Sequence, residues 1–151
     1  MSNLTVRQAV LDDINALSTL FDSYRQFYGC ASDLNAAREF LLARFNRSES
    51  IIFIAEDAGT AIGFTQLYPS FSSASLARVF ILNDIFVDEN CRRKGAANLL
   101  LTAAIKFARS LGAIRLTLST EISNETAQAL YSAAGWKRDQ KFLVFHYTLQ
   151  V

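Results

Sequence analysis

The stretch Cys91–Leu101, CRRKGAANLLL, sets three consecutive cations and one glycine before small residues and a leucine run. The segment before it, residues 76–87, is nearly all apolar and is typical of a strand buried on both faces. A strand, a turn, a glycine and a helix start can bind an anion, because the first helical turn has unpaired N–H groups and partial positive charge. Gly95 would leave the backbone open to a bulky anion. A solvated basic surface is the alternative interpretation.

Two common phosphate-binding motifs are missing from the sequence. It contains neither G-x-x-x-x-G-K-[ST] nor G-x-G-x-x-G. We therefore expect a phosphate-bearing ligand other than ATP or NAD.

Composition limits the remaining classes. The 151 residues predict a single domain, 1–151, and the net charge of +1 gives no general attraction to nucleic acid or to anionic membranes. Two cysteines, Cys30 and Cys91, and one histidine match no metal spacing, so no metal is expected. The N-terminus has no signal-peptide pattern, which favours a cytoplasmic location, and no apolar run is long enough to span a membrane. The 12 phenylalanines predict a large core and an apolar contact for a homodimer.

Working outward from Gly95, hydrophobic periodicity predicts alternating strands and helices. The expected strands are residues 4–10, 50–57, 60–70, 76–87, 113–120 and 142–150. The expected helices start at Asp12 or Asp13, at Asp33, after Gly95, and at Ser123 or Asn124. The residues expected to face the core are Ile14, Leu17, Leu20, Phe21 and Tyr24 of the first helix, Ala37, Phe40, Leu41 and Phe45 of the second, and Leu99 or Leu100, Ala103, Phe107 and Leu111 of the third. This order predicts a mixed α/β layered sheet.

A second constellation lies in SNETAQALYSAAGW, residues 123–136. Tyr131 follows Asn124 by seven residues, about two helical turns, so both side chains share one face of the expected helix. The pair would flank an elongated ligand, although core packing of Tyr131 explains the spacing equally simply.

Together the two stretches resemble the GCN5-related N-acetyltransferase (GNAT) superfamily, whose members transfer an acetyl group from acetyl-CoA to an amine. The family's loop [QR]-x-x-G-x-[GA] is met by Arg92, Gly95 and Ala97. Its second motif is met by Asn124, Ala127, Leu130, Tyr131, Gly135 and Trp136. The resemblance covers residues 4–150 and implies a mixed central sheet of about six to seven strands with about four helices.

The resemblance also implies the residues that bind acetyl-CoA. The main chain of Ile85, Phe86 and Val87 would bind the pantetheine arm. The residues implied around the pyrophosphate are Arg92, Arg93, Lys94, Gly95, Ala96, Ala97 and Asn98. Asn124 would contact the coenzyme near the pantetheine, and Tyr131 would lie beside its sulfur. Arg93 departs from the family, in which many members have glycine at this position.

Acetyl transfer needs a neutral amine, a donor to the developing oxyanion and a proton for the leaving thiolate. Tyr131 is the expected acid, and Asp84 the expected base, with Glu56 and Glu121 as alternatives. Asp84 interrupts an apolar strand, where an unpaired carboxylate is costly, although a salt bridge to Arg78 or Arg115 would also explain it. Cys91 as a covalent carrier is the weaker alternative to direct attack.

The acceptor is the least determined part of the sequence. Tyr24, Tyr28, Asn83 and Asp84 are the residues expected to bind it. The strand around Asn83 looks similar to the corresponding strand of the diamine and thialysine acetyltransferases, which has two adjacent acidic residues. Here only the second, Asp84, is acidic, and the first is Asn83. We expect a small-molecule primary amine as acceptor. Acetylation of a protein amine, and a non-catalytic module that binds CoA or nucleic acid, are the alternatives.

Overall fold

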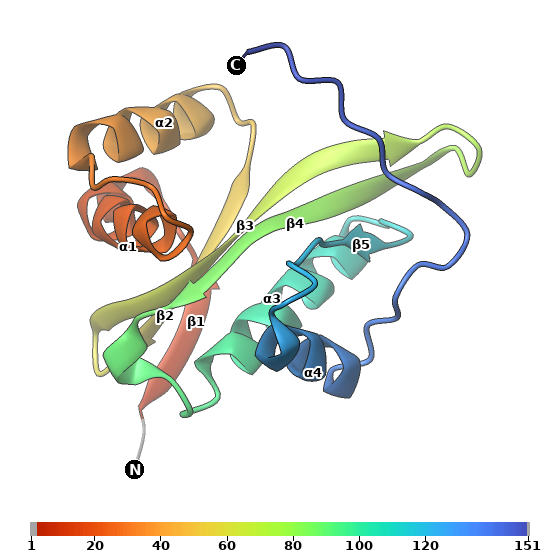
Figure 1. Cartoon of the computed structure of the whole chain (residues 1–151). Helices are drawn as coiled ribbons and strands as arrows, with labels where there is room; N and C mark the ends of the chain where they lie inside the picture. Colours follow the sequence, from red (N-terminus) through yellow and green to blue (C-terminus); the bar gives the residue numbers. More distant parts are fainter. Residues whose placement is uncertain (1–2, 151) are drawn as a thin grey trace. The chain divides into compact units, whose positions relative to one another are not determined.

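A five-stranded mixed sheet organises the computed structural model, which describes residues 3–150 (Figure 1). Its strands, in spatial order, are β1 (Leu4–Gln8), β2 (Ile51–Asp57), β3 (Thr60–Ser72), β4 (Ala77–Val87) and β5 (Leu116–Thr117). The first four pair antiparallel, and β5 pairs parallel to β4. The mixed α/β fold predicted from the sequence is confirmed.

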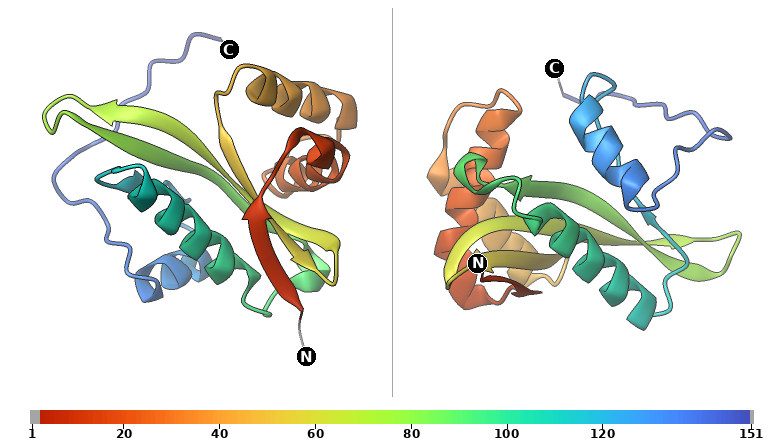
Figure 2. Two further views of the ribbon diagram at one scale, coloured as in Figure 1. Left: turned by 180° about the vertical axis from the view of Figure 1, so that it is seen from behind. Right: turned by 90° about the horizontal axis from the view of Figure 1, so that it is seen from below.

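Helices cover both faces of the sheet. Helices α1 (Ile14–Phe27) and α2 (Leu34–Asn46) lie on one face, and α3 (Ala96–Ser110) crosses the other (Figures 1 and 2). Short 3-10 turns, Leu11–Asp13 and Glu89–Cys91, precede α1 and the loop before α3. The expected cap of α2 is confirmed, because the Asp33 side chain accepts a hydrogen bond from the Ala36 N–H at 3.0 Å.

The core between α1, α2 and the sheet combines most of the residues that helical periodicity selects with residues of the sheet, while Tyr24 and Phe45 pack against it partly buried. Its buried members are Ala9, Ile14, Leu17, Leu20, Phe21, Ala37, Leu41, Ile52, Ile54, Phe64 and Phe86. Phe40 departs from the expectation, since it is 40% exposed. Its ring stacks on Phe21, and the Arg44 guanidinium lies over it at 4.4 Å, so it forms the edge of the core rather than its interior.

On the other face, α3 packs through Phe107, whose ring meets Phe53 at 5.6 Å and Phe80 at 5.7 Å. The buried residues of α3 are Ala96, Leu100, Leu101, Ala104 and Ala108. Of the two leucines left open by the sequence, Leu100 is therefore the buried one. Leu111 is exposed, contrary to the expectation, because α3 ends at Ser110 and the chain turns at Gly112.

An extra residue in β4 changes which side chains share a face of the sheet. Gln66 is opposite Asp84 in the register, while the next residue, Leu67, is opposite Leu82. Asn83 is therefore a β-bulge, so that Leu82 and Asp84 point to opposite faces. Leu82 joins Phe80 on the α3 face, and Asp84 turns toward α1.

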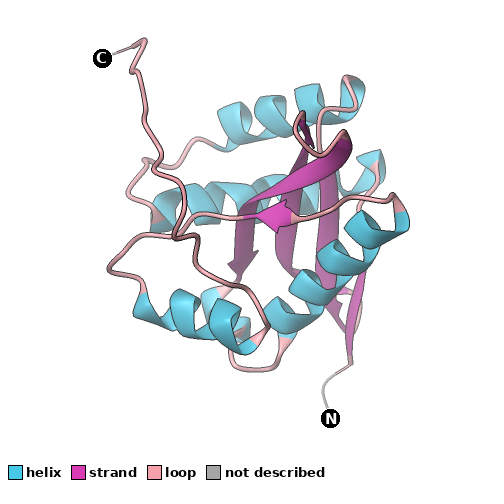
Figure 3. Cartoon of the chain, turned by 90° about the vertical axis from the view of Figure 1, so that its right-hand side faces the viewer, coloured by secondary structure: helices cyan, strands magenta, loops and turns pink. Residues whose placement is uncertain are grey.

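The chain divides into two compact units, residues 1–119 and 120–151, which are described separately. In the second unit, α4 (Glu125–Ala133) begins where the Asn124 side chain accepts from the Ala127 N–H at 3.1 Å. The strand predicted over residues 142–150 is wrong, because this segment has no regular secondary structure (Figure 3). The predicted six to seven strands are likewise too many, since residues 3–150 form five. An apolar pattern supplies strand propensity but not the partner that a strand requires.

Candidate functional site

The loop before α3 has a backbone suited to binding an anion. Gly95 caps the helix with a φ of 89°, and Arg93 has a φ of 65°, while Lys94 between them has a negative φ. Successive residues that alternate in this way turn their N–H groups toward one concave side, which binds anions. An added Cβ at Gly95 would meet no heavy atom within 4 Å, so the space beside it is open.

The N-terminus of α3 continues this concave surface. Ala96 and Ala97 begin the helix, and the first hydrogen bond within it runs from the Leu99 N–H to the Gly95 carbonyl at 3.2 Å. The N–H groups of residues 96–98 precede that bond, and the helix dipole adds partial positive charge to them. The predicted pyrophosphate residues thus lie in one continuous turn.

Two of the three cations in this loop already have partners within the protein. The Arg92 Nε donates to the Val87 carbonyl at 2.9 Å, and its guanidinium lies 5.4 Å from the Phe27 ring and 5.6 Å from the Phe86 ring. The Lys94 Nζ lies 3.5 Å from the Asp57 carboxylate. Arg92 therefore holds the end of β4 against α1, a structural role that the sequence did not indicate.

The main chain that was predicted to bind pantetheine lies along an open strand edge. β5 pairs with β4 only at Phe80 and Ile81. Among residues 3–150, no strand pairs with the same edge of β4 from Leu82 to Val87. Its peptide groups on this edge are therefore available to an extended ligand that hydrogen-bonds like a strand.

Asp84 lies in a group of polar side chains on the α1 face of the sheet. Its Oδ2 accepts from the Gln66 Nε2 at 2.8 Å, and its Oδ1 accepts from the Asn83 Nδ2 at 3.1 Å. The Tyr24 hydroxyl of α1 also donates to this carboxylate. The structure thus brings together three of the four predicted acceptor residues, Tyr24, Asn83 and Asp84.

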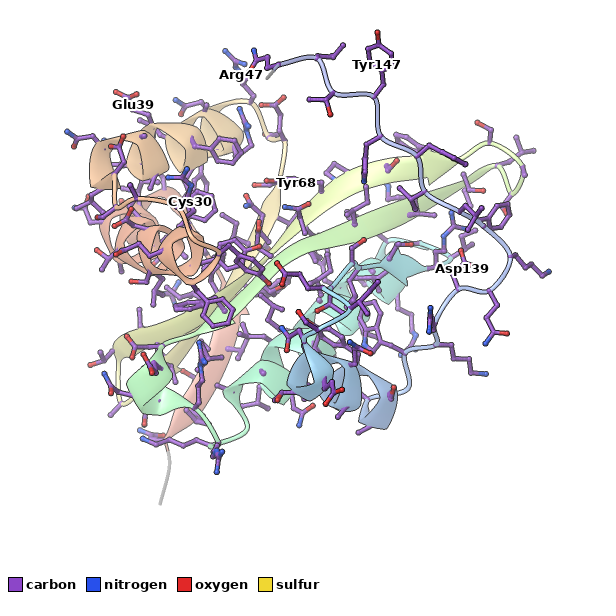
Figure 4. The ribbon with its side chains drawn as sticks, in the orientation of Figure 1. Cys30, Glu39, Arg47, Tyr68, Asp139 and Tyr147 are labelled. Carbon is purple, nitrogen blue, oxygen red and sulfur yellow. The ribbon has the colours of Figure 1, made fainter. Side chains whose placement is uncertain are left out.

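The Asp84 carboxylate is buried without a positive partner. Its residue is 4% exposed, and no ion pair within residues 3–150 includes it, so the alternative salt bridge to Arg78 or Arg115 is not formed. Burial raises the pKa of Asp84, and its neutral hydrogen-bond donors counter this only in part. Burial and the Asp84 charge also raise the pKa of Tyr68 to about 12. Tyr68 belongs to β3, and its side chain lies on the α2 side of the sheet (Figure 4).

Two further residues border this polar group. Tyr28, the fourth predicted acceptor residue, is 47% exposed, and its ring lies 4.9 Å from that of Tyr24. Gln66 is fully buried and was not predicted as a site residue. In the sequence, Gln66 is the one amide in the uncharged segment TAIGFTQLYPS. A single amide of this kind is just as typical of a solvent-facing position as of a binding site.

The other predicted candidates have separate environments. Glu56 accepts from the Arg7 Nε at 2.8 Å, so this alternative base is held in an ion pair. Cys91 is a free thiol in the short turn before the loop. In the second unit, Asn124 uses its side-chain oxygen as the α4 cap, and Tyr131 lies 6.2 Å from the Trp136 ring. Glu121 accepts a long 3.5 Å hydrogen bond from the Ser123 hydroxyl.

Within residues 3–150, no group of three or more His, Cys, Asp and Glu side chains is placed to hold a metal ion. Over the same residues, no helix has the length and apolar character that crossing a membrane requires.

Comparison with known proteins identifies the family of the chain. The model of the Acetyltransferase (GNAT) family matches residues 16–136. Uncharacterized N-acetyltransferase YhfO of Bacillus subtilis (strain 168) is 49% identical over 148 residues, which cover 98% of both chains. The crystal structure of a probable acetyltransferase has a TM-score of 0.91 at 43% identity, covering 97% of this chain and 99% of that chain. An aminoglycoside N-acetyltransferase crystallised with CoA shares the fold, with a TM-score of 0.81 at 20% identity over 97% of this chain and 96% of that chain. The chain therefore belongs to the acetyltransferase (GNAT) family of acetyl-CoA-dependent N-acetyltransferases.

Proposed function

We propose that this N-acetyltransferase acetylates the primary amine of a small molecule, and that Asp84 is its general base. The observation that carries the proposal is the buried Asp84 carboxylate, which has neutral hydrogen-bond donors and no ion-pair partner among residues 3–150. A buried carboxylate is costly, and the N–H donors of a bound amine offset part of this cost.

The coenzyme would be held by the loop and by the open edge of β4. The concave N–H groups of residues 93–98 fit a diphosphate, and the unpaired edge at residues 85–87 fits the amide groups of a pantetheine arm. Acetyl-CoA supplies the acetyl group as a reactive thioester. The role of the protein is then to hold that thioester and to move two protons.

We assign those proton transfers to Asp84 and Tyr131. The amine reacts in its neutral form, and as the nitrogen–carbon bond forms, the Asp84 carboxylate accepts a proton from that nitrogen. The carbon–sulfur bond breaks, and Tyr131 donates its phenolic proton to the leaving sulfur. Exchange with solvent then restores both groups. The raised pKa of Asp84 makes its carboxylate a stronger base than an exposed aspartate, which suits this role.

The acceptor is proposed as a small polyamine or an amino-acid-like amine. The support is the composition of the site, in which Tyr24 and Asn83 donate to one carboxylate and Tyr28 packs on Tyr24. A diamine calls for a second anionic group, and the uncharged Asn83 does not supply it, which favours the amino-acid-like amine over the polyamine. A cytoplasmic location and a homodimer stay predictions from the sequence.

The test is a screen for CoA release from acetyl-CoA with four acceptors: 1,4-diaminobutane, L-ornithine, alanine and a lysine-containing peptide. We expect turnover of at least one of the first three acceptors. Asp84→Asn should lower that turnover at least about 100-fold, because it removes the general base. Turnover of the peptide alone would favour a protein acceptor. Binding of acetyl-CoA without turnover of any amine would favour the non-catalytic module.

A further inference from the structure

Gln66 lies beside the proposed base, and only the nitrogen of its amide group has a hydrogen-bond partner among residues 3–150. It occupies β3 opposite Asp84, is fully buried, and donates from Nε2 to the Asp84 Oδ2 at 2.8 Å. An amide that faces a carboxylate must present its NH₂ group, because two oxygens would repel one another. The Oε1 of Gln66 is therefore on the other branch of the same amide group, turned away from the Asp84 Oδ2.

This oxygen lacks a hydrogen-bond partner in the described part of the chain. A buried carbonyl without a donor is destabilising, and native proteins keep few such groups. The Asp84 Oδ1 accepts a hydrogen bond from Asn83, and Tyr24 also donates to the carboxylate. The Gln66 Oε1 and the buried carboxylate thus form two adjacent acceptors that together require N–H or O–H donors.

We propose that Gln66 is an acceptor-binding residue that selects primary over N-methylated amines, an inference that rests on the proposed function. A neutral primary amine has two N–H groups and one lone pair. One N–H donates to the Asp84 carboxylate and the other to the Gln66 Oε1, which leaves the lone pair free to face the thioester. An N-methylated amine has one N–H, so one of the two buried acceptors stays without a donor.

The experiment compares kcat/KM for matched amines in wild type and variants. The pairs are alanine with N-methylalanine, and 1,4-diaminobutane with N,N′-dimethyl-1,4-diaminobutane. Gln66→Leu removes both amide functions at similar volume, and Gln66→Met is made alongside in case the branched side chain prevents folding. Thr65→Val is the control, because Thr65 is equally buried and its hydroxyl donates to the Asp84 main-chain oxygen at 2.8 Å.

The wild type and Thr65→Val are expected to prefer the primary amine by at least about tenfold, the effect of one unpaired buried acceptor. In the Gln66 variants this ratio should fall toward one, while the KM for acetyl-CoA stays unchanged. The size of the N-methyl group affects kcat/KM in the wild type and in every variant alike. A change in the ratio between them therefore reports the loss of the Gln66 Oε1 as a hydrogen-bond acceptor. An unchanged ratio in an active Gln66 variant would overturn the inference and leave a buried water as the partner of Oε1. If the wild type turns over no amine, the proposed function itself fails.

Discussion

Replacing Gly95 by valine tests the coenzyme loop directly. Gly95 has a φ of 89°, which a β-branched residue adopts only at high cost, and its missing side chain leaves open space beside the start of α3. The substitution should therefore have two effects. It should lower stability through the backbone, and it should block the approach of the diphosphate.

The size of both effects follows from the geometry. A left-handed conformation costs about 1–2 kcal/mol for a residue with a Cβ. For a chain of about 150 residues, each kcal/mol corresponds to about 2–4 °C in Tm, so the variant should melt about 2–8 °C below wild type. Acetyl-CoA at about 100 times its Kd should stabilise wild type by about 2.7 kcal/mol, or about 5–11 °C. Gly95→Val should lose most of that rise.

Gly112→Val is the matched control. Gly112 also has a positive φ, 74°, and also has no heavy atom within 4 Å of an added Cβ, but it follows the other end of α3. Both variants should melt at similar temperatures without ligand, as measured by differential scanning fluorimetry. Only Gly112→Val should keep the full rise with acetyl-CoA. A full rise in Gly95→Val would refute the placement of the diphosphate at this loop.

Three further substitutions probe individual residues of the site. Because burial raises the pKa of Asp84, its protonated form is favoured in the folded state, and its contribution to stability declines as pH rises through that raised pKa. Asp84→Asn should therefore stabilise the protein at pH 7 by about 0.5–2 kcal/mol, with a gain that shrinks toward pH 4 in urea titrations. Arg92→Lys should lower the free energy of unfolding by about 1–2 kcal/mol, because lysine cannot reproduce the Nε bond to Val87 and the ring contacts; an unchanged urea midpoint would contradict that role. Arg93→Gly should relieve about 1–2 kcal/mol of left-handed strain. It should also cost about 0.5–1 kcal/mol of stability, because glycine increases the conformational entropy of the unfolded chain, so the Tm should stay level or rise slightly.

Turn chemistry made one part of the fold predictable to the residue. The strands predicted over residues 50–57 and 60–70 end at Asp57 and resume at Thr60, as the structure has them. Ala58 and Gly59 both have positive φ, the conformation that a two-residue hairpin turn requires. This information is local, because Gly59 and the strand-forming residues on either side specify the turn without any distant contact.

Pairing between distant strands was not predictable in the same way. The segment 113–120 has strand propensity throughout, but only Leu116–Thr117 pair with β4. The same limit explains the missing strand at 142–150. A segment forms a strand only where a neighbouring strand has a free hydrogen-bonding edge. The periodicity of a single sequence does not show where that edge lies.

The motif predicted the turn before α3, and its role in binding the coenzyme stays a prediction. The polar group around Asp84 was predicted only in part. The bulge at Asn83 lies within an apolar run, so alternation gave no sign that Leu82 and Asp84 face opposite sides. Gln66 was missed for the same reason. Its partner across the sheet is set by register, and register becomes visible only once both strands are placed.

Three unfavourable choices are concentrated in two neighbouring strands and the loop that follows them. Asp84 buries a carboxylate without a cation among residues 3–150, Gln66 buries an amide oxygen without a donor there, and Arg93 occupies a left-handed backbone position that glycine tolerates better. A leucine, an apolar residue and a glycine would each suit the fold alone at least as well. Left-handed residues other than glycine also occur at the turns of Ser48, Ala58 and Leu76, whereas the Asp33 cap and the Gly59 turn follow local preference. The proposed acceptor would offset the first two costs by bringing N–H donors to Gln66 and Asp84. The left-handed position of Arg93 would be compensated by the N–H groups that the loop turns toward the proposed diphosphate. Under this proposal, substrate binding rather than folding accounts for all three.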